Sequence, residues 1–361
     1  MVKKINHFNS KLLFGNQLNF DLDAILEKEY NDCKIAIITD ENVYNLWFED
    51  LITSTTLLHN AEVIQLPSGE DTKGIEICYQ VWETLAEYKF NRGDLIINFG
   101  GGVITDFGGF VASTFKRGVQ FINIPTTLLA QVDASIGGKT GVNLGDKKNL
   151  IGSFSNANYV FIDYKYLNTL NEVELKSGFA EMLKHGLIND KKHWHNLIKL
   201  KNFSVNGISS FIYDSVLIKH QIVKADPFEK DIRKSLNFGH TFGHAYEGLF
   251  LNKQVIIPHG YAVALGMIFE TYLSYKLKYI EVNIYKEIYN SISFIYDFTP
   301  ITDNDIDTLL LLMKYDKKNT NSFYNFTLLT DIGTYKINCL IDVDTVNESL
   351  EEFIGYFFES K

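Results

Sequence analysis

The stretch DLIINFGGGVITDFGGF, residues 94–110, decides the fold. Its apolar start, residues 94–100, is typical of a buried β-strand, and three consecutive glycines then lead into a segment with a helical pattern. Because glycine has no side chain, backbone N–H groups in such a turn can approach a phosphate, and the start of a helix adds partial positive charge. The spacing is not the GxGxxG fingerprint. The stretch alone favours a pyrophosphate site and leaves a tight strand-to-helix turn as the alternative.

Other short apolar runs surround this stretch in the first half of the chain, and amphipathic segments such as residues 79–88 lie between them. The alternation predicts a mostly parallel sheet covered by helices, with ligand sites at the carboxyl ends of its strands. Asp40 and Asn42 follow one such run, where an acid can bind a ribose hydroxyl or cap a helix. The additional predicted strands are residues 34–39, 61–66, 119–125 and 158–163.

The pattern changes at about Asn171 to long helical periods that are broken at Pro227, Pro258 and Pro300. Near the end, residues 326–340 predict a β-hairpin and residues 344–357 a closing helix. We therefore expect two domains around one cleft. They are an α/β domain, residues 1–165, with a mostly parallel nucleotide-binding sheet, and a mainly α-helical domain, residues 166–361.

Composition limits the kind of partner that the chain can have. Its 361 residues are 46% hydrophobic, which excludes a disordered chain, and its net charge of −10 argues against a protein that coats nucleic acid or anionic membranes. Cys33, Cys78 and Cys339 lie far apart, so neither a disulfide framework nor a cysteine metal site is indicated. Without an apolar stretch at the N-terminus or a membrane-spanning run, the sequence predicts a soluble, cytoplasmic protein.

A loop region after the fourth predicted strand carries charged side chains between small residues. The segments PTTLLAQVDASIGGKTGVN and DKKNLIGSF contain Asp133, Lys139, Lys148 and Asn149 beside glycine and threonine pairs. Small neighbours expose such side chains to a small anionic ligand. The alternative is an ordinary solvated loop.

Three histidines and one acid form a candidate metal site. His240 and His244 are four residues apart on one helical face, His259 lies at a predicted helix start, and Glu181 shares a helical face with Lys184. Imidazoles with a carboxylate suit zinc or a similar divalent ion. Spacing alone would make both His240 and His244 ligands, and two satisfied, partly buried histidines are the alternative.

A scattered set of basic and amide side chains completes the candidates. Arginine forks bind carboxylate or phosphate through two hydrogen bonds, so several such groups in one cleft could hold a doubly charged substrate. Taken singly, each is better explained as a solvated surface group than as part of a binding site. The set consists of Arg117, Lys219, Arg233, Asn237, Lys317 and Lys318.

In this order, the motifs resemble the 3-dehydroquinate synthase family of sugar phosphate cyclases, from about Asp40 to Lys318. The resemblance depends on four segments: residues 100–118, 125–143, 177–188, and 236–248 with 258–260. It implies NAD in the α/β domain and zinc, or another divalent metal such as cobalt, in the helical domain. The implied substrate is 3-deoxy-D-arabino-heptulosonate 7-phosphate and the implied product is 3-dehydroquinate, a shikimate-pathway compound in aromatic amino acid biosynthesis.

The resemblance also implies roles for individual residues. It makes Glu181, His240 and His259 the metal ligands, and it places His244 with the substrate phosphate, which differs from the reading by spacing alone. The implied cofactor-binding residues are Asp40, Asn42, Glu70, Lys73, Gly101, Gly102, Val103, Asp106, Thr126, Thr127, Lys139, Lys148 and Thr169. The implied substrate-binding residues are Lys139, Asn149, Lys184, Lys219, Arg233, Asn237, His244 and one of Lys317 and Lys318.

Lys139, Asp133 and His244 are the candidates for proton handling and orientation, and no residue is assigned as the general base. A homodimer is implied as well, with Arg117 near the neighbouring subunit's phosphate site.

The chain departs from the family pattern at three places. Thr105 precedes Asp106 where the family has glycine, LGDKKN replaces HPLGKN at residues 144–149, and Asn171 replaces a proline. None of these changes removes a charged group. Two other functions remain open: a cyclase for a carboxylate-free sugar phosphate, which Arg233 and Asn237 argue against, and a metal-dependent polyol dehydrogenase that releases NADH.

Overall fold

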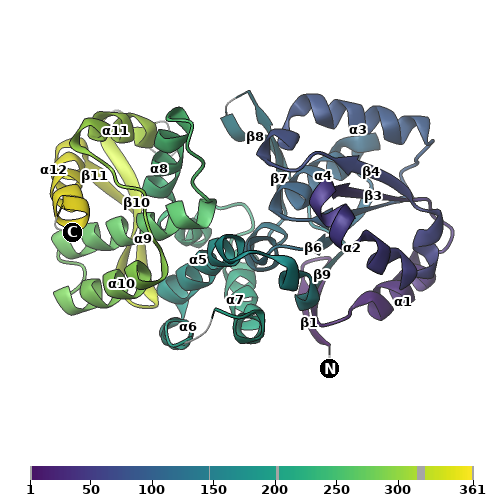
Figure 1. The fold of residues 1–361 in the computed structure, drawn as a ribbon, viewed down its shortest axis with the longest axis horizontal. Coiled ribbons are helices and arrows are strands. Elements are labelled where there is room, and N and C mark those ends of the chain that lie inside the picture. Colours follow the sequence, from purple (N-terminus) through teal and green to yellow (C-terminus); the bar gives the residue numbers. More distant parts are fainter. Residues whose placement is uncertain (1, 146, 201–202, 315–321, 360–361) are drawn as a thin grey trace. The chain divides into compact units, whose positions relative to one another are not determined.

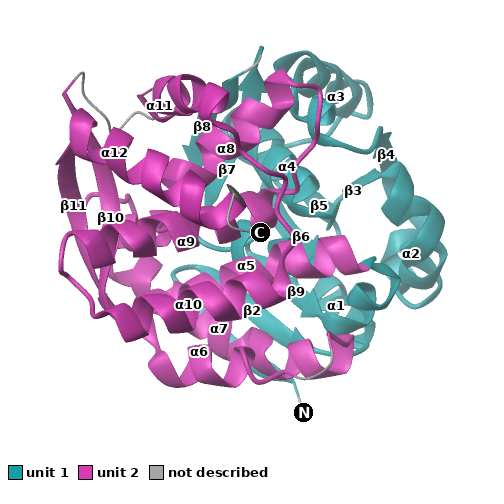
Figure 2. Cartoon of the chain, turned by 60° about the vertical axis from the view of Figure 1, so that its left-hand side comes forward, with its two compact units in different colours: residues 1–171 teal, residues 172–361 magenta. Residues whose placement is uncertain are grey.

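The chain divides into two compact units, residues 1–171 and 172–361, which Figure 2 shows in different colours. A computed structural model describes residues 2–145, 147–200, 203–314 and 322–359. The boundary follows Asn171, where the sequence pattern changes from alternating strands and helices to long helices, whereas the sequence analysis places it at residue 165.

The first unit is built on a seven-stranded sheet, shown in Figure 1. β1 pairs antiparallel with β2, and every other neighbouring pair is parallel, which confirms the predicted mostly parallel sheet. All five predicted strands are present, whereas the β1–β2 hairpin was not predicted. In sheet order the strands are β1 (Lys3–His7), β2 (Ser10–Gly15), β9 (Tyr159–Asp163), β6 (Gln120–Pro125), β5 (Leu95–Gly100), β3 (Ile35–Asp40) and β4 (Glu62–Leu66).

Helices cover both faces of this sheet. Successive strand residues point to opposite faces, so Ile97 and Phe99 join the core under α1 and α2, while Asn98 faces α4. The side chain of Asn98 leaves no room for a Cβ at Gly108, so α4 lies directly on the strand. The helices are α1 (Asn19–Glu29), α2 (Glu41–Thr53), α3 (Ile75–Glu87) and α4 (Gly102–Thr114).

The strand order creates a topological switch point between β3 and β5. The chain leaves β3 for β4 on one side of the sheet, and it leaves β5 for β6 on the other. In open α/β sheets a ligand crevice forms at the carboxyl ends of the strands where these directions diverge. Here that position lies between Asp40, the last residue of β3, and Gly101, which follows β5.

Shorter elements at the same edge bring further polar residues there. The segment after β4 forms η2 (Glu70–Lys73), and the segment after β6 contains the π-helical turn η4 (Ala130–Ala134). A second hairpin, β7 (Lys139–Leu144) with β8 (Lys147–Phe154), follows. The remaining short helices of this unit are η1 (Thr56–Asn60), η3 (Phe115–Arg117) and η5 (Tyr164–Thr169).

The second unit is mainly helical, as predicted, and it also contains the predicted hairpin, β10 (Phe323–Asp331) with β11 (Thr334–Asp342). Its helices are α5 (Glu172–Asn189), α6 (Lys191–Leu197), α7 (Val205–Ala225), η6 (Ile232–Asn237), α8 (His240–Asn252), α9 (His259–Lys276), α10 (Val282–Ile295), η7 (Asp303–Asp305), α11 (Ile306–Lys314), α12 (Val343–Ile354) and η8 (Gly355–Glu359).

α9 is the central helix of this unit. It packs against α5, α8, α10, α12 and β10, and its residues are buried on all sides, which is expected of a helix that is apolar around its whole circumference. Helix α9 thus lies in the core of this unit, with α8 packed against it.

Among the described residues, no helix is both long enough and apolar enough to span a membrane.

Candidate active site

Two different requirements explain the glycines after β5. A Cβ on Gly100 would lie 2.6 Å from Cβ of Ile104, so the turn can pack only with glycine at this position. This agrees with the alternative explanation of the glycines, a tight strand-to-helix turn. A Cβ on Gly102 would lie 3.4 Å from Cβ of Ala134, an ordinary contact. Gly101 is the N-cap of α4 and supplies no side-chain hydrogen bond to the first turn. Packing accounts for Gly100 but not for Gly102, where backbone N–H groups could receive an anion.

Across the switch point, Asp40 caps helix α2. Its Oδ1 accepts hydrogen bonds from the backbone N–H groups of Asn42 and Val43, both at 3.0 Å, and Oγ of Ser68 lies 3.5 Å from the same atom. Asp40 is therefore the N-cap residue of α2, one of the two roles predicted for it. The carboxylate also lies at the edge where a ribose would be expected, and the structure brings Asn42 next to it.

Lys73 and Asp106 form an ion pair. Nζ of Lys73 lies 2.6 Å from Oδ2 of Asp106, and the lysine side chain is only 4% exposed. Desolvation raises the pKa of the Asp106 carboxyl, the Lys73 ammonium opposes this shift, and Glu70 and Asp133 add to it. Three predicted cofactor residues, Glu70, Lys73 and Asp106, thus influence one another directly.

The sequence analysis did not single out Asn143, which connects two groups of candidates. Its Nδ2 donates to Oε1 of Glu70 at 2.9 Å, and its Oδ1 accepts from the N–H of Asn149 at 2.8 Å. Asn149 has a positive φ of 51°, a backbone conformation that residues other than glycine adopt only uncommonly. Asn143 therefore holds the β7–β8 hairpin, which carries Lys139 and Lys148, against η2.

The remaining candidates of the first unit lie in the segments that follow β6 and β9. Thr126 follows β6, and its Oγ1 is buried without a hydrogen-bond partner among the described residues. Oγ1 of Thr127 accepts from the N–H of Ala130, at the start of the π-helical turn that carries Asp133. Thr169, at the end of η5, accepts a 2.9 Å hydrogen bond from Nε1 of Trp47.

Arg117 lies in a segment with a strained backbone between α4 and β6. Lys116, Arg117 and Gly118 have positive φ values of 48°, 65° and 111°, and the Arg117 side chain is exposed. Consecutive residues in this conformation cost energy, and such strain is concentrated at functional positions.

In the second unit, the carboxylate of Glu181 is the centre of the candidate metal site. It lies on the buried part of α5, is 0% exposed, and forms an ion pair with Lys184, which is also buried. Apart from this ion pair at Oε2, the carboxylate oxygens have no hydrogen-bond partner among the residues that the structure describes. The Lys184 ammonium offsets part of the cost of burying the charge, and Oε1, which faces the histidines, suits a ligand position for a cation.

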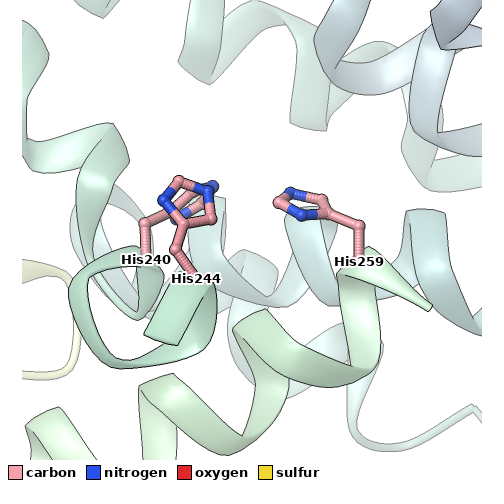
Figure 3. Close-up of side chains that lie close together, drawn as sticks. All are labelled: His240, His244 and His259. Atoms are coloured by element: carbon pink, nitrogen blue, oxygen red, sulfur yellow. The ribbon is translucent and has the colours of Figure 1, made fainter. Parts of the chain in front are cut away.

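Histidines from α8 and α9 face this carboxylate. Oε1 of Glu181 lies 3.5 Å from Nε2 of His240 and 3.8 Å from Nε2 of His259. Ligand atoms at zinc bond lengths of about 2.0–2.2 Å in tetrahedral geometry lie about 3.4 Å apart, so these residues fit a zinc-sized ion. Ring nitrogens of His240, His244 and His259 also lie within 4.8 Å of one another (Figure 3). The structure thus brings together all four residues considered from the sequence.

Outer contacts orient two of the imidazoles. Nδ1 of His240 lies 3.2 Å from the carbonyl oxygen of Phe238, and Nδ1 of His259 lies 3.4 Å from Oε2 of Glu247. Such contacts direct the other ring nitrogen, Nε2, toward a metal. Burial, with further effects of Lys184, His244 and His259, holds the pKa of His240 well below its usual range. His240 is therefore neutral at physiological pH, the state in which imidazole binds metals.

Basic and amide candidates occupy α5, α7 and η6 of the same unit. Lys184, Lys219 and Arg233 are all buried, which is unusual for cations and argues against simple surface charges. Nη1 of Arg233 donates to the carbonyl of Pro227 at 2.5 Å, and Nδ2 of Asn237 donates to Oε1 of Glu229 at 2.8 Å. Lys317 and Lys318 lie outside the described residues.

The sequence analysis missed Glu247, Glu270 and Asn143. Glu247 follows His244 by three residues, a spacing that places both on one helical face, so this signal was available. Glu270 lies in an otherwise apolar helix, where a lone acid is a recognisable exception.

Two adjoining family models match this chain. The 3-dehydroquinate synthase N-terminal model matches residues 63–177, and the 3-dehydroquinate synthase C-terminal model matches residues 178–319. A 3-dehydroquinate synthase of Parabacteroides distasonis is 41% identical over 350 residues, which cover 94% of this chain and 97% of the relative.

Two solved structures share the fold. A 2-deoxy-scyllo-inosose synthase complexed with carbaglucose-6-phosphate, NAD+ and Co2+ has a TM-score of 0.84 at 23% identity, covering 98% of this chain and 99% of that chain. The 2-epi-5-epi-valiolone synthase ValA of Streptomyces hygroscopicus, with NAD+ and Zn2+ bound, has a TM-score of 0.80 at 21% identity, covering 98% of each chain. With matches to both family models and a relative of 41% identity along nearly the whole chain, the protein belongs to the 3-dehydroquinate synthase family.

Proposed function

We propose that the chain is a 3-dehydroquinate synthase, a phosphate-eliminating lyase of the shikimate pathway. It converts 3-deoxy-D-arabino-heptulosonate 7-phosphate to 3-dehydroquinate and phosphate, with NAD and a divalent metal as cofactors. The observation that carries the proposal is the buried carboxylate of Glu181, which faces Nε2 of both His240 and His259. The NAD and metal ions named for the two structural relatives support the cofactors.

The reaction needs a reversible oxidation at one carbon. When bound, NAD would accept and return a hydride, and the divalent ion would polarise the hydroxyl that is oxidised. Oxidation of the C5 alcohol to a ketone acidifies the neighbouring C–H bond, so the phosphate can leave by elimination. Reduction of the ketone, ring opening and an intramolecular aldol closure then give the carbocycle without net consumption of NAD.

The residues of the second unit would bind the metal and the anionic ends of the substrate. In this proposal Glu181, His240 and His259 hold the ion, and His244 contacts the phosphate. The positive charges of Lys184, Lys219 and Arg233 would attract the phosphate and carboxylate groups, and Asn237 would add a hydrogen bond to the carboxylate. Arg233 and Asn237 are residue types that donate hydrogen bonds to a carboxylate, which favours the acid over carboxylate-free sugar phosphates.

The residues of the first unit would bind the nucleotide. The N–H groups at Gly101, Gly102 and Val103 suit the pyrophosphate, as the start of a helix attracts anions. Asp40 and Glu70 would accept hydrogen bonds from the adenosine ribose, with Asn42 and Lys73 beside them. Asp106, Thr126, Thr127, Lys139, Lys148 and Thr169 would line the rest of the cofactor. Asp133, Lys139 and His244 are the groups proposed for proton handling, and Asn149 would contact the substrate.

The proposal includes a cytoplasmic homodimer. The strained backbone at Lys116, Arg117 and Gly118 holds an exposed arginine, which supports a role for Arg117 at the neighbouring subunit's phosphate site. Light scattering should give twice the mass of one chain. A monomer that retains full activity would contradict this part of the proposal.

The deciding experiment measures phosphate release and NADH absorbance in one sample. We expect many turnovers of phosphate from 3-deoxy-D-arabino-heptulosonate 7-phosphate with catalytic NAD and added zinc, and no net NADH. Glu181→Gln should abolish release, whereas Lys191→Met, which removes an exposed ion pair with Asp331, should leave it unchanged. Steady NADH accumulation would indicate a dehydrogenase. Turnover only with sugar phosphates that lack a carboxylate would indicate a related cyclase.

A further inference from the structure

Glu270 is a fully buried acid that the proposed reaction does not use. It lies within α9, the helix that begins at His259, and its side chain is 0% exposed. Oε2 accepts a hydrogen bond from the N–H of Gly239 at 2.7 Å, and Oε1 accepts one from the N–H of Phe242 at 3.4 Å. Burial of a carboxylate costs much of its hydration energy, so these bonds offset a large penalty.

The two N–H groups belong to the beginning of α8. Gly239 is the N-cap residue of this helix, has a left-handed φ of 80°, and supplies no side-chain cap of its own. The acceptor for the first turn therefore comes from the neighbouring helix, because Glu270 takes the place that an N-cap side chain usually fills. Gly239 directly precedes His240, and Phe242 lies between His240 and His244.

The helices α8 and α9 touch through their backbones beside this contact. A Cβ on Gly266 would lie 1.9 Å from the carbonyl oxygen of Gly239, and a Cβ on Gly243 would lie 2.8 Å from that of Ala262. Residues larger than glycine would push the helices apart. The close glycine contacts fix the distance between α8 and α9, and Glu270 forms its hydrogen bonds to the first turn of α8 beside these contacts.

We infer that Glu270 is a positioning residue of the metal centre. It holds the first turn of α8 on α9, and so sets the position of His240 relative to His259 and Glu181. It is not one of the proposed metal ligands, and it acts through the backbone N–H groups of Gly239 and Phe242. The inference rests on the proposed function in one respect, which is the assignment of His240 and His259 as metal ligands.

The test compares metal binding with folding in the purified full-length chain. Zinc affinity is measured by competition with a chromophoric chelator, the Co2+-loaded protein gives a d–d absorption spectrum, and circular dichroism gives the unfolding temperature. Glu270→Leu removes both acceptor atoms, and Glu270→Gln keeps one. We expect Glu270→Leu to weaken zinc binding by about tenfold or more and to alter the cobalt spectrum, with Glu270→Gln in between.

A matched control separates positioning from general stability. Asp190 accepts hydrogen bonds from the N–H groups of Lys192 and His193 at the start of α6, a helix of the same unit without predicted site residues. Asp190→Ala should lower the unfolding temperature and leave zinc affinity and the cobalt spectrum unchanged. If Glu270→Leu does not fold, the comparison of Glu270→Gln with Asp190→Ala decides.

The outcomes distinguish this inference from the proposed function. Wild-type zinc affinity and an unchanged cobalt spectrum in the folded Glu270 variants would overturn the role of Glu270 and leave the function intact. A wild-type chain that binds zinc but releases no phosphate would overturn the function and leave this inference standing if the Glu270 variants still bind zinc weakly. A wild-type chain that binds no divalent ion would overturn both.

Discussion

Oε2 of Glu247 lies 3.4 Å from Nδ1 of His259, the ring nitrogen opposite the one near Glu181. A carboxylate in this position orients the imidazole and makes it a better ligand. Glu247→Gln should therefore reduce zinc affinity by about tenfold, measured by chelator competition. Glu351→Gln, which alters an exposed contact with Asn347, is the control and should have no effect. Unchanged affinity in Glu247→Gln would show that His259 needs no such support.

The three histidines should separate into two roles. His259→Ala should abolish zinc retention after dialysis, because the proposed ligand set would lose one of its two imidazoles. His244→Ala should retain zinc and lose turnover, because this exposed ring is proposed to contact the phosphate. Metal content by elemental analysis and phosphate release would be measured on the same samples. Equal metal loss in both variants would return His244 to the ligand set that its spacing indicates.

Lys73→Met should destabilise the fold by about 2 to 3 kcal/mol near neutral pH, because it leaves a partly buried carboxylate without its cation. Desolvation already raises the pKa of Asp106 above its ordinary 3.8, so the folded state binds this proton more readily than the unfolded state. The fold therefore loses stability as the pH rises through the pKa of the Asp106 carboxyl, because the charged form is less favourable in the folded state. Loss of Lys73 makes this decrease in stability larger. Urea unfolding should show a larger difference from wild type at about pH 7 than at about pH 4. A difference independent of pH would contradict this explanation.

Gly100, the last residue of β5, and Gly102, the first residue of α4, should respond differently to substitution by alanine. Gly100→Ala should cost about 1 to 3 kcal/mol of stability, since its Cβ would collide with Ile104. Gly102→Ala should leave the unfolding midpoint unchanged and weaken NAD binding by about tenfold, because the methyl group would occupy the approach of the pyrophosphate. Fluorescence titration with NADH measures the second effect. Wild-type NADH affinity in Gly102→Ala would mean that these glycines only shape the turn.

Asn143→Ala should weaken NAD binding although Asn143 is not a predicted ligand. It removes the hydrogen bonds that hold Glu70 and the backbone of Asn149, each worth about 1 kcal/mol. We expect the dissociation constant for NADH to rise about fivefold. Asn91→Ala, at an exposed contact with Lys116, serves as the control. An effect on stability alone would make Asn143 a structural residue of the hairpin.

Short apolar runs were sufficient to predict the central strands, because strands buried on both faces need nearly continuous apolar residues. The β1–β2 hairpin was missed since its first strand, KKINH, contains a single apolar residue among polar ones. The second strand, β2, joins the sheet by pairing with β9, where Lys11 lies opposite Tyr159. Local sequence patterns carry no information on a contact between residues so far apart in the chain.

Residue types with a distinctive chemistry were found more readily than their supports. His240, His259 and Glu181 could be nominated from spacing and family pattern, and the structure brings them together. Asn143 could not, because the role of an amide inside a strand depends on the distant groups that it contacts. Glu270 could be noticed as the lone acid of an apolar helix, but its partners could not be predicted. The N–H groups that Glu270 binds are not encoded near residue 270 in any local motif.

The glycine contact between α8 and α9 has a consequence for ion size. Because the helices already touch, their first turns cannot move together to suit a smaller ion, and Glu270 opposes their separation around a larger one. Adjustment is left to rotation of the imidazole and carboxylate groups, which permits only small changes in radius. We therefore expect the helix pair to favour ions close to zinc and cobalt in radius over much larger ones such as calcium.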